Sequence, residues 1–115
     1  MKIIDGNKHW YQNGKLHRDD DEPAKTEIGG DIKILAHYKN GELHREGDKP
    51  AIIIDKDGTH IEKYYHAGLM HRIGGAAFTR TGEFGDITEH RIHGQLVSPD
   101  NNTPSQKIVN FHDYE

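Results

Sequence analysis

Histidine is the residue of this chain best suited to chemistry, because a neutral imidazole can bind a transition metal and can move a proton near neutral pH. The chain has 10 histidines in 115 residues. Three of them are followed by an arginine, as His17-Arg18, His44-Arg45 and His71-Arg72. Each pair lies three residues after a glycine, and these glycines, Gly14, Gly41 and Gly68, recur every 27 residues.

A metal site does not follow from this spacing. If the copies stack as pairs of strands, equivalent histidines lie roughly 9.6 Å apart, which is twice the spacing of neighbouring strands. A zinc ion with Zn–N bonds of about 2.0 to 2.1 Å cannot join ligands across that gap. His90 and His93 are an odd number of residues apart and point to opposite faces of a strand. The sequence therefore predicts no metal site and no cofactor.

The repeated His-Arg pair has two interpretations. A feature present in every copy is expected to build the repeat, for example by donating hydrogen bonds to backbone carbonyls. Alternatively, Arg18, Arg45 and Arg72 form a ladder of guanidinium groups that binds an acidic partner or the phosphates of a nucleic acid.

Two features that are not repeated could specify a partner. The acidic loop Asp19, Asp20, Asp21 and Glu22 has no matching base nearby in the sequence, and it is either a solvated loop or a docking patch for a basic partner. It lacks the alternating spacing of a calcium loop. Tyr64 and Phe78 are candidates for an apolar binding patch.

An enzyme is the second class of function. Histidine and carboxylates could supply acid and base catalysis, but there is no cysteine, and the two serines, Ser98 and Ser105, lie near the end of the chain. A pocket that gathers His, Arg and carboxylates from different strands would favour an enzyme, whereas an open sheet would not. We expect no catalysis.

Composition narrows the remaining classes. Hydrophobic residues make up 32% of the chain and its mean hydropathy is -0.93, which suits a thin sheet better than a thick core. The net charge of -4 gives no support to nucleic-acid binding. No apolar run is long enough for a signal peptide or a membrane span, so we expect a soluble, cytoplasmic protein with no membrane partner.

The repeat itself predicts an all-β fold. Each copy has a strand after a Pro-Ala pair, a glycine-bearing turn, and a return strand that ends in Tyr-x-x-Gly. Identical copies can stack identically only if each has an even number of strands, so we assign two. The prediction is a single-layer antiparallel meander of about seven strands, with Asn-Gly-x-Leu-His-Arg as a structured connection.

These elements place the repeat array in residues 1–97. It comprises an N-terminal half repeat, three copies, and a decayed fourth copy at Arg91–Leu96. Residues 98–115 form a polar linker and an irregular tail, whose alternating apolar residues 108–114 could return as a strand or remain flexible.

The pattern Tyr-x-x-Gly-x-x-His, followed by a strand and a further turn glycine, resembles the MORN repeat over about residues 6–97. Here His17-Arg18, His44-Arg45 and His71-Arg72 replace the usual His-Gly, and a Pro-Ala pair follows in two copies, as in divergent MORN-like repeats of bacterial, viral and phage proteins. The resemblance implies an elongated sheet used for protein contacts and self-association, without an active site. It suggests a small phage-type inhibitor or adaptor that acts on a host protein.

A physical argument also points to association. Residues 51–54, Ala-Ile-Ile-Ile, place apolar side chains on both faces of one strand, and a single layer cannot cover both. We therefore expect a protein partner, either a target protein or a second copy in a homodimer.

Overall fold

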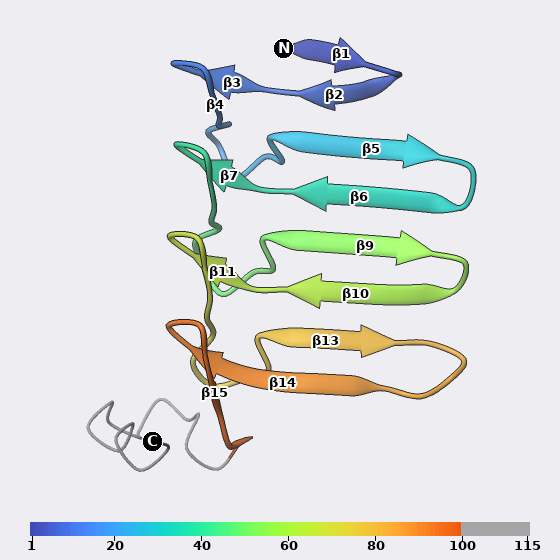
Figure 1. Ribbon diagram of the computed structural model, residues 1–115, viewed down its shortest axis with the longest axis vertical. Coiled ribbons are helices and arrows are strands. Elements are labelled where there is room, and N and C mark those ends of the chain that lie inside the picture. The colour runs from blue at the N-terminus through green and yellow to red at the C-terminus, as the bar shows by residue number, and fades with distance from the viewer. Residues whose placement is uncertain (100–115) are drawn as a thin grey trace.

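The computed structural model describes residues 1–99, in which the regular elements are β-strands. Figure 1 shows the strands as long hairpins on one side of the molecule and short hairpins on the other. The strands are β1 (Lys2–Ile4), β2 (Asn7–His9), β3 (Tyr11–Gln12), β4 (Lys15–Leu16), β5 (Lys25–Gly29), β6 (Ile32–Ala36), β7 (Tyr38–Lys39), β8 (Glu42–Leu43), β9 (Ile52–Lys56), β10 (Thr59–Lys63), β11 (Tyr65–His66), β12 (Leu69–Met70), β13 (Phe78–Thr81), β14 (Ile87–Ile92) and β15 (Gln95–Val97).

Nine of these strands form one antiparallel sheet in the order β1-β2-β5-β6-β9-β10-β13-β14-β15. The pairs β3-β4, β7-β8 and β11-β12 are separate two-stranded sheets. The molecule is thus built from four units, β1–β4, β5–β8, β9–β12 and β13–β15, which follow one another along the sheet (Figure 1).

The predicted all-β class and antiparallel pairing are confirmed, but the prediction of about seven strands is wrong. The structure has 15 strands in the described residues, because the connection Asn-Gly-x-Leu closes on itself as a hairpin with two residues in each arm. Each complete unit therefore holds four strands rather than two. The number is still even, so successive units run in the same direction.

The short hairpins turn through two residues of positive φ, the geometry that matches the twist of a hairpin. In the second unit these residues are Asn40 (φ 51°) and Gly41 (φ 85°), and in the third they are Ala67 (φ 50°) and Gly68 (φ 83°). Asparagine tolerates this conformation better than alanine does. The Asn-Gly pair is thus explained by the backbone of the turn.

The best-buried residues are small and lie where each long hairpin meets a short one. Ala24, Ala51 and Ala77 are 0% exposed, and each is bonded on both sides through its backbone. In the third unit, for example, the Ala51 amide donates to the Lys63 carbonyl at 2.8 Å, and the Ala51 carbonyl accepts from His37 at 2.7 Å. No large side chain in the described residues is fully buried. Backbone pairing, more than a hydrophobic core, holds the units together.

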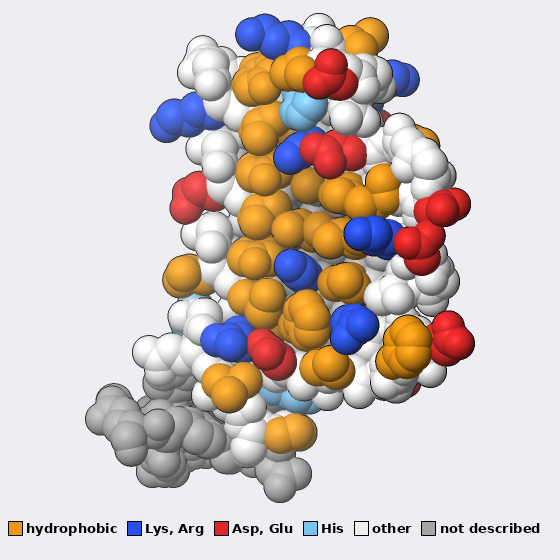
Figure 2. Space-filling model, turned by 45° about the vertical axis from the view of Figure 1, so that its right-hand side comes forward, with side chains coloured by type: hydrophobic (Ala, Val, Ile, Leu, Met, Phe, Trp, Pro, Cys, Tyr) orange, Lys and Arg blue, Asp and Glu red, His pale blue; other side chains and the backbone are white. Residues whose placement is uncertain are grey.

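One face of the sheet is apolar along its middle. The register pairs Ile34 with Ile54 and Ile54 with Ile61, and it pairs Ile52 with Lys63, which is opposite Phe78. Paired residues share a face of the sheet. We call this surface the isoleucine face, and its side chains are half-buried (Figure 2). Ile53 and Leu35 pair on the opposite face.

Two sequence expectations concern the ends of the chain and its environment. The predicted tail strand at residues 108–114 lies outside the described residues. Within residues 1–99 there is no helix with the length and apolar character of a membrane span.

The turn geometry generates a prediction about stability. Replacing Ala67→Asn is expected to raise the free energy of unfolding, and Asn40→Ala to lower it, each by roughly 1 kcal/mol, because asparagine adopts positive φ at lower cost. The amides of both residues make the same bond to a histidine ring, so that bond is common to the pair. Urea unfolding measures both changes in unfolding free energy. A change of the same sign for the two substitutions would contradict the explanation.

Candidate functional site

The Leu-His-Arg segment joins each short hairpin to the next one. In the second unit, the Leu43 carbonyl accepts from the Gly68 amide at 2.9 Å, His44 Nδ1 accepts from the Ala67 amide at 2.9 Å, and the Arg45 amide donates to the Tyr65 carbonyl at 3.3 Å. The same three bonds recur one unit earlier from Leu16, His17 and Arg18, and one unit later from Met70, His71 and Arg72. We call this repeated set of bonds the seam.

The seam fixes the protonation of its histidines. A ring nitrogen that accepts from a backbone N–H carries no proton, so neutral His44 holds its proton on Nε2. His44 Nε2 donates to Glu46 at 2.7 Å, and His17 Nε2 donates to Asp19 at 2.8 Å. This hydrogen bond lowers the pKa of Glu46. Both nitrogens of these two rings are therefore engaged within the chain.

The arginine side chains bind carboxylates of the preceding unit. Arg45 donates to Asp21 at 2.8 and 3.3 Å and to the Pro50 carbonyl at 3.0 Å. Arg72 donates in the same way to Asp48 and to a carbonyl of its own loop. The hydrogen bond from Arg45, with a second from Lys49, holds the pKa of Asp21 far below its usual range. Asp21 thus receives its bases from a segment that is distant in the sequence. Asp19 and Glu22 bond instead to the adjacent His17 and Arg18, so the expectation that the loop has no matching base nearby is wrong.

Two arginines also cover an aromatic ring of their own unit. The guanidinium carbon of Arg18 lies 3.8 Å from the Trp10 ring centre, and that of Arg72 lies 4.0 Å from Tyr64. Tyr64 is only 8% exposed, and burial raises its pKa. It is therefore a packing residue of the joint between the hairpins, not part of an exposed patch.

Two equivalent hollows lie between successive units. The first, of about 420 Å³, is lined by Arg18, Asp21, His37, Tyr38, His44 and Arg45, among others. The second, of about 340 Å³, is lined by the corresponding residues of the next unit, including Asp48, Tyr64 and Arg72. Each hollow gathers His, Arg and carboxylates from different segments, which the sequence argument named as a sign of an enzyme.

Most groups in the first hollow are already bonded. His37 is the exception: it is 5% exposed, its Nδ1 donates to the Ala51 carbonyl at 3.3 Å, and its Nε2 has no partner. Burial and the nearby Arg45 charge lower the pKa of His37, so its ring is neutral. No serine or cysteine lines the hollow to serve as a nucleophile.

One group of side chains has the composition of a metal site. Ligand atoms of His44, Glu46 and His66 lie within 4.8 Å of one another, an arrangement that the sequence argument missed because it compared only equivalent positions. A metal on His44 Nε2 would move the ring proton to Nδ1. Nδ1 could then no longer accept the hydrogen bond that the Ala67 amide donates to it. Metal binding would therefore break a bond of the seam.

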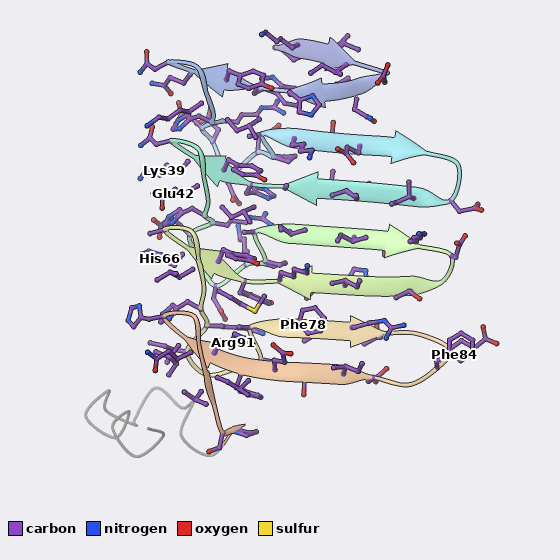
Figure 3. The ribbon with its side chains drawn as sticks, in the orientation of Figure 1. Lys39, Glu42, His66, Phe78, Phe84 and Arg91 are labelled. Carbon is purple, nitrogen blue, oxygen red and sulfur yellow. The ribbon has the colours of Figure 1, made fainter. Side chains whose placement is uncertain are left out.

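The imidazole rings also form a row along the short hairpins. His44 and His66 have ring centres 4.5 Å apart, and His71 stacks on His93 at 4.4 Å. Figure 3 shows Lys39, Glu42 and His66 on this side of the molecule, away from the sheet. Burial and the neighbouring rings lower the pKa of His71.

The predicted binding residues thus fall into separate places. The three repeated arginines lie at successive unit boundaries, and each guanidinium group donates hydrogen bonds within the chain: Arg18, Arg45 and Arg72. Three carboxylates of the acidic loop also bond within the chain: Asp19, Asp21 and Glu22. Asp20 is exposed and makes no ion pair within the described residues. Only Phe78 lies on the isoleucine face, whereas Phe84 is 89% exposed at the far turn of the sheet (Figure 3).

Sequence reasoning missed the partners of the arginines, although a signal was present. In the first two copies an aspartate follows the repeated arginine by three residues, as Asp21 and Asp48, and in the third copy Gly75 takes that position. An aspartate in the third copy would have no arginine to bind, because the decayed fourth copy lacks the repeated His-Arg pair. The recurrence of an aspartate three residues after the arginine was therefore the signal for the bonds between the arginine of one unit and the aspartate of the unit before it.

Comparison of the chain with known proteins finds no family model, curated protein or solved structure that matches it. The resemblance to MORN repeats therefore remains an inference from the residues themselves.

The arginine bonds generate a prediction about stability. Arg45→Gln removes three hydrogen bonds and is expected to lower the free energy of unfolding by about 2 kcal/mol, because bonds to charged groups are the stronger ones. Lys33→Gln is the control, since the exposed ammonium group of this β6 residue makes no hydrogen bond or ion pair with the described residues. A double-mutant cycle with Asp21→Asn should show coupling of about 1 kcal/mol, and additive effects would exclude the pair.

Two histidines are expected to give opposite dependences of stability on pH. Hydrogen bonds with Glu62 and Asp55 raise the pKa of His60 above 6.5, so its stabilisation is complete below that pH and is lost as pH rises. The pKa of His71 is lowered below 6.5, so its effect is reversed and stability is lost as pH falls.

Urea unfolding at several pH values tests this contrast. The difference in unfolding free energy between the natural chain and His60→Gln should grow as pH falls toward 6.5 and stay constant below it. The difference for His71→Asn, in which the amide oxygen replaces the ring acceptor, should shrink as pH falls below 6.5. Parallel trends for the two variants would contradict the assignments.

Proposed function

We propose that this chain is a non-catalytic β-repeat module that binds another protein chain through the isoleucine face. The observation that carries the proposal is the half-exposed row of Ile34, Ile54 and Ile61, with Ile52 and Phe78 beside it, on one side of a single layer. A monomeric protein rarely leaves a large contiguous apolar patch in water. The partner presents an apolar strip with charged groups at its ends.

The composition of the face supports a protein ligand. The register places the Lys25–Glu27 ion pair on one side of the apolar residues and Glu89, paired with Arg91, on the other. Lys63 and Arg80 lie between them, and Figure 2 shows Lys and Arg side chains among the hydrophobic ones. An apolar centre with a charged rim is the usual anatomy of a protein interface. A phosphate chain would instead require a surface of predominantly positive charge.

The alternative of phosphate binding through Arg18, Arg45 and Arg72 is less well supported. Arg45 would have to release Asp21 to reach a phosphate, which would leave that carboxylate without its strongest partner. The same exchange would be required at the pair of Arg72 with Asp48. Binding would therefore have to offset the loss of bonds between units.

The hollows favour catalysis as a second candidate, through the unpartnered His37 Nε2. In the second hollow the position equivalent to His37 is occupied by Tyr64, whose phenol group is not a base comparable to a neutral imidazole. A hollow that recurs at each boundary, lined by the bonds that join units, is better explained as a consequence of stacking. An inhibitor or adaptor that acts on a host protein is the role suggested by the resemblance to MORN-like repeats alone.

The proposal predicts a difference between adjacent residues of β9. Ile54→Lys places a charge in the middle of the isoleucine face, and it is expected to weaken partner binding at least tenfold because the ammonium group would be desolvated. Ile53→Lys is the matched control on the opposite face, with the same substitution in the same strand. Binding of a purified partner is measured by titration calorimetry for both variants.

Circular dichroism and urea unfolding establish that both variants remain folded. Equal weakening by the two substitutions would place the binding surface elsewhere. Unchanged binding of Ile54→Lys would remove the isoleucine face from the proposal.

A further inference from the structure

We propose that the partner of the isoleucine face is a second copy of this chain, packed face to face about a two-fold axis parallel to β9. This inference rests on the proposed function and names the occupant of the same surface. It follows from the order of residues across the sheet, which is complementary to itself when one copy is turned over. Sheets packed in this way lie about 10 Å apart with their strands within roughly 30° of alignment.

The axis is defined by the topology. β9 is the fifth strand of the nine-stranded sheet, with four strands on each side. A two-fold rotation about β9 reverses the order of strands and keeps the position along each strand. It therefore brings β6 of one copy opposite β10 of the other, β5 opposite β13, and β2 opposite β14.

The middle of this interface is apolar except for Lys63 of β10, which lies beside Ile52 on the same face and would come opposite Ala36 of the second copy. Ile54 and Ile52 lie on the axis and meet the same residues of the second copy, while Ile34 meets Ile61. All four side chains are half-buried in the single chain and would become fully buried between two sheets. Burial of apolar area of this kind is the main favourable term in association.

The charged residues on the two sides are opposite in sign. Glu27 of β5 lies in the same row as Ile34, Ile54 and Ile61, and so does Arg80 of β13. The rotation brings Glu27 opposite Arg80 of the second copy, twice in the dimer. Lys25 comes opposite Phe78, whose ring already has the Lys63 ammonium group of its own chain 5.9 Å from its centre. An unpaired like charge at these positions would instead oppose docking.

Arg80 has no partner for its charge within the described residues, although its side chain is only partly exposed. A half-buried guanidinium beside Ile61 and Ile87 is costly unless a carboxylate lies near it. Glu27 already pairs with Lys25 at 3.1 Å, and a carboxylate can accept from two cations. The second copy therefore supplies the group that Arg80 lacks.

Lys56 is the only charged residue of β9 on this face, and it would lie opposite Lys56 of the second copy. It lies at the exposed end of the strand, so its long side chain can place the ammonium group in water. On the opposite face of the sheet, the same rotation would bring Leu35 opposite the Glu62 carboxylate, and Ile53 would meet itself.

Cross-linking of single-cysteine variants tests the axis, because the natural chain contains no cysteine. Ile54→Cys, whose residue meets itself on the axis, is treated with a short bifunctional maleimide, and Ile53→Cys is the matched control on the opposite face. A covalent dimer from Ile54→Cys and none from Ile53→Cys is the expected result. Equal cross-linking of both, or none of either, would overturn the proposal.

Charge reversal tests the complementarity. Glu27→Arg and Arg80→Glu should each weaken the dimer at least tenfold in sedimentation equilibrium, because each places like charges opposite one another. The double variant carrying both reversals should recover the dimer to within about threefold, since the two signs are exchanged together. Failure of the double variant to recover, with the fold intact by circular dichroism, would reject the two-fold arrangement.

The two proposals fail in different ways. If the natural chain sediments as a monomer at high concentration while Ile54→Lys, but not Ile53→Lys, loses binding to a different protein, the second copy is excluded and the binding face is retained. If the natural chain is a dimer that Ile54→Lys leaves intact, both proposals fall.

Discussion

Successive units are joined by backbone ladders between neighbouring long strands and by the seam, three hydrogen bonds that three consecutive residues make at each boundary, Leu-His-Arg in two copies and Met-His-Arg in the third. Each such bond contributes roughly 0.5 to 1.5 kcal/mol, and the set repeats at three boundaries. Stability is then a sum over neighbouring units rather than the property of one core, as in other repeat proteins. This explains why the segment is kept nearly unchanged while the loops and long strands around it differ between copies.

The long strands also join units through their backbones, because β6 pairs with β9 and β10 pairs with β13 across the boundaries. A strand held by backbone pairing needs β-propensity, which threonine would supply as well as isoleucine does. The chain nevertheless has Ile52 and Ile54 on the central strand and Ile34 and Ile61 beside them. The concentration of apolar side chains exceeds what backbone pairing requires, and the proposal of a covered isoleucine face rests on this excess.

The sequence predicted what depends on periodicity and missed what depends on placement in space. The period of 27 residues was sufficient to infer an all-β antiparallel stack, since equal segments must pair equally. The short hairpins were taken as connections because an arm of two residues, such as Tyr38–Lys39, carries no alternation to read. The bond of Arg45 to Asp21 spans 24 residues, and the contact of His44 with His66 depends on which way two rings point. Neither can be derived from period and composition alone.

The differences between copies carry as much information as the similarities. Glu27, Ile54 and Arg80 occupy equivalent positions of successive units, in one row of the sheet, so the array begins with an acid, continues with an apolar residue and ends with a base. Copies that were identical would present the same residue at every step and would repel themselves wherever that residue was charged. A row that changes sign about its middle can meet itself only when one copy is reversed. In the proposed dimer, the divergence of the units would thus select a single orientation from the many that a uniform repeat would allow.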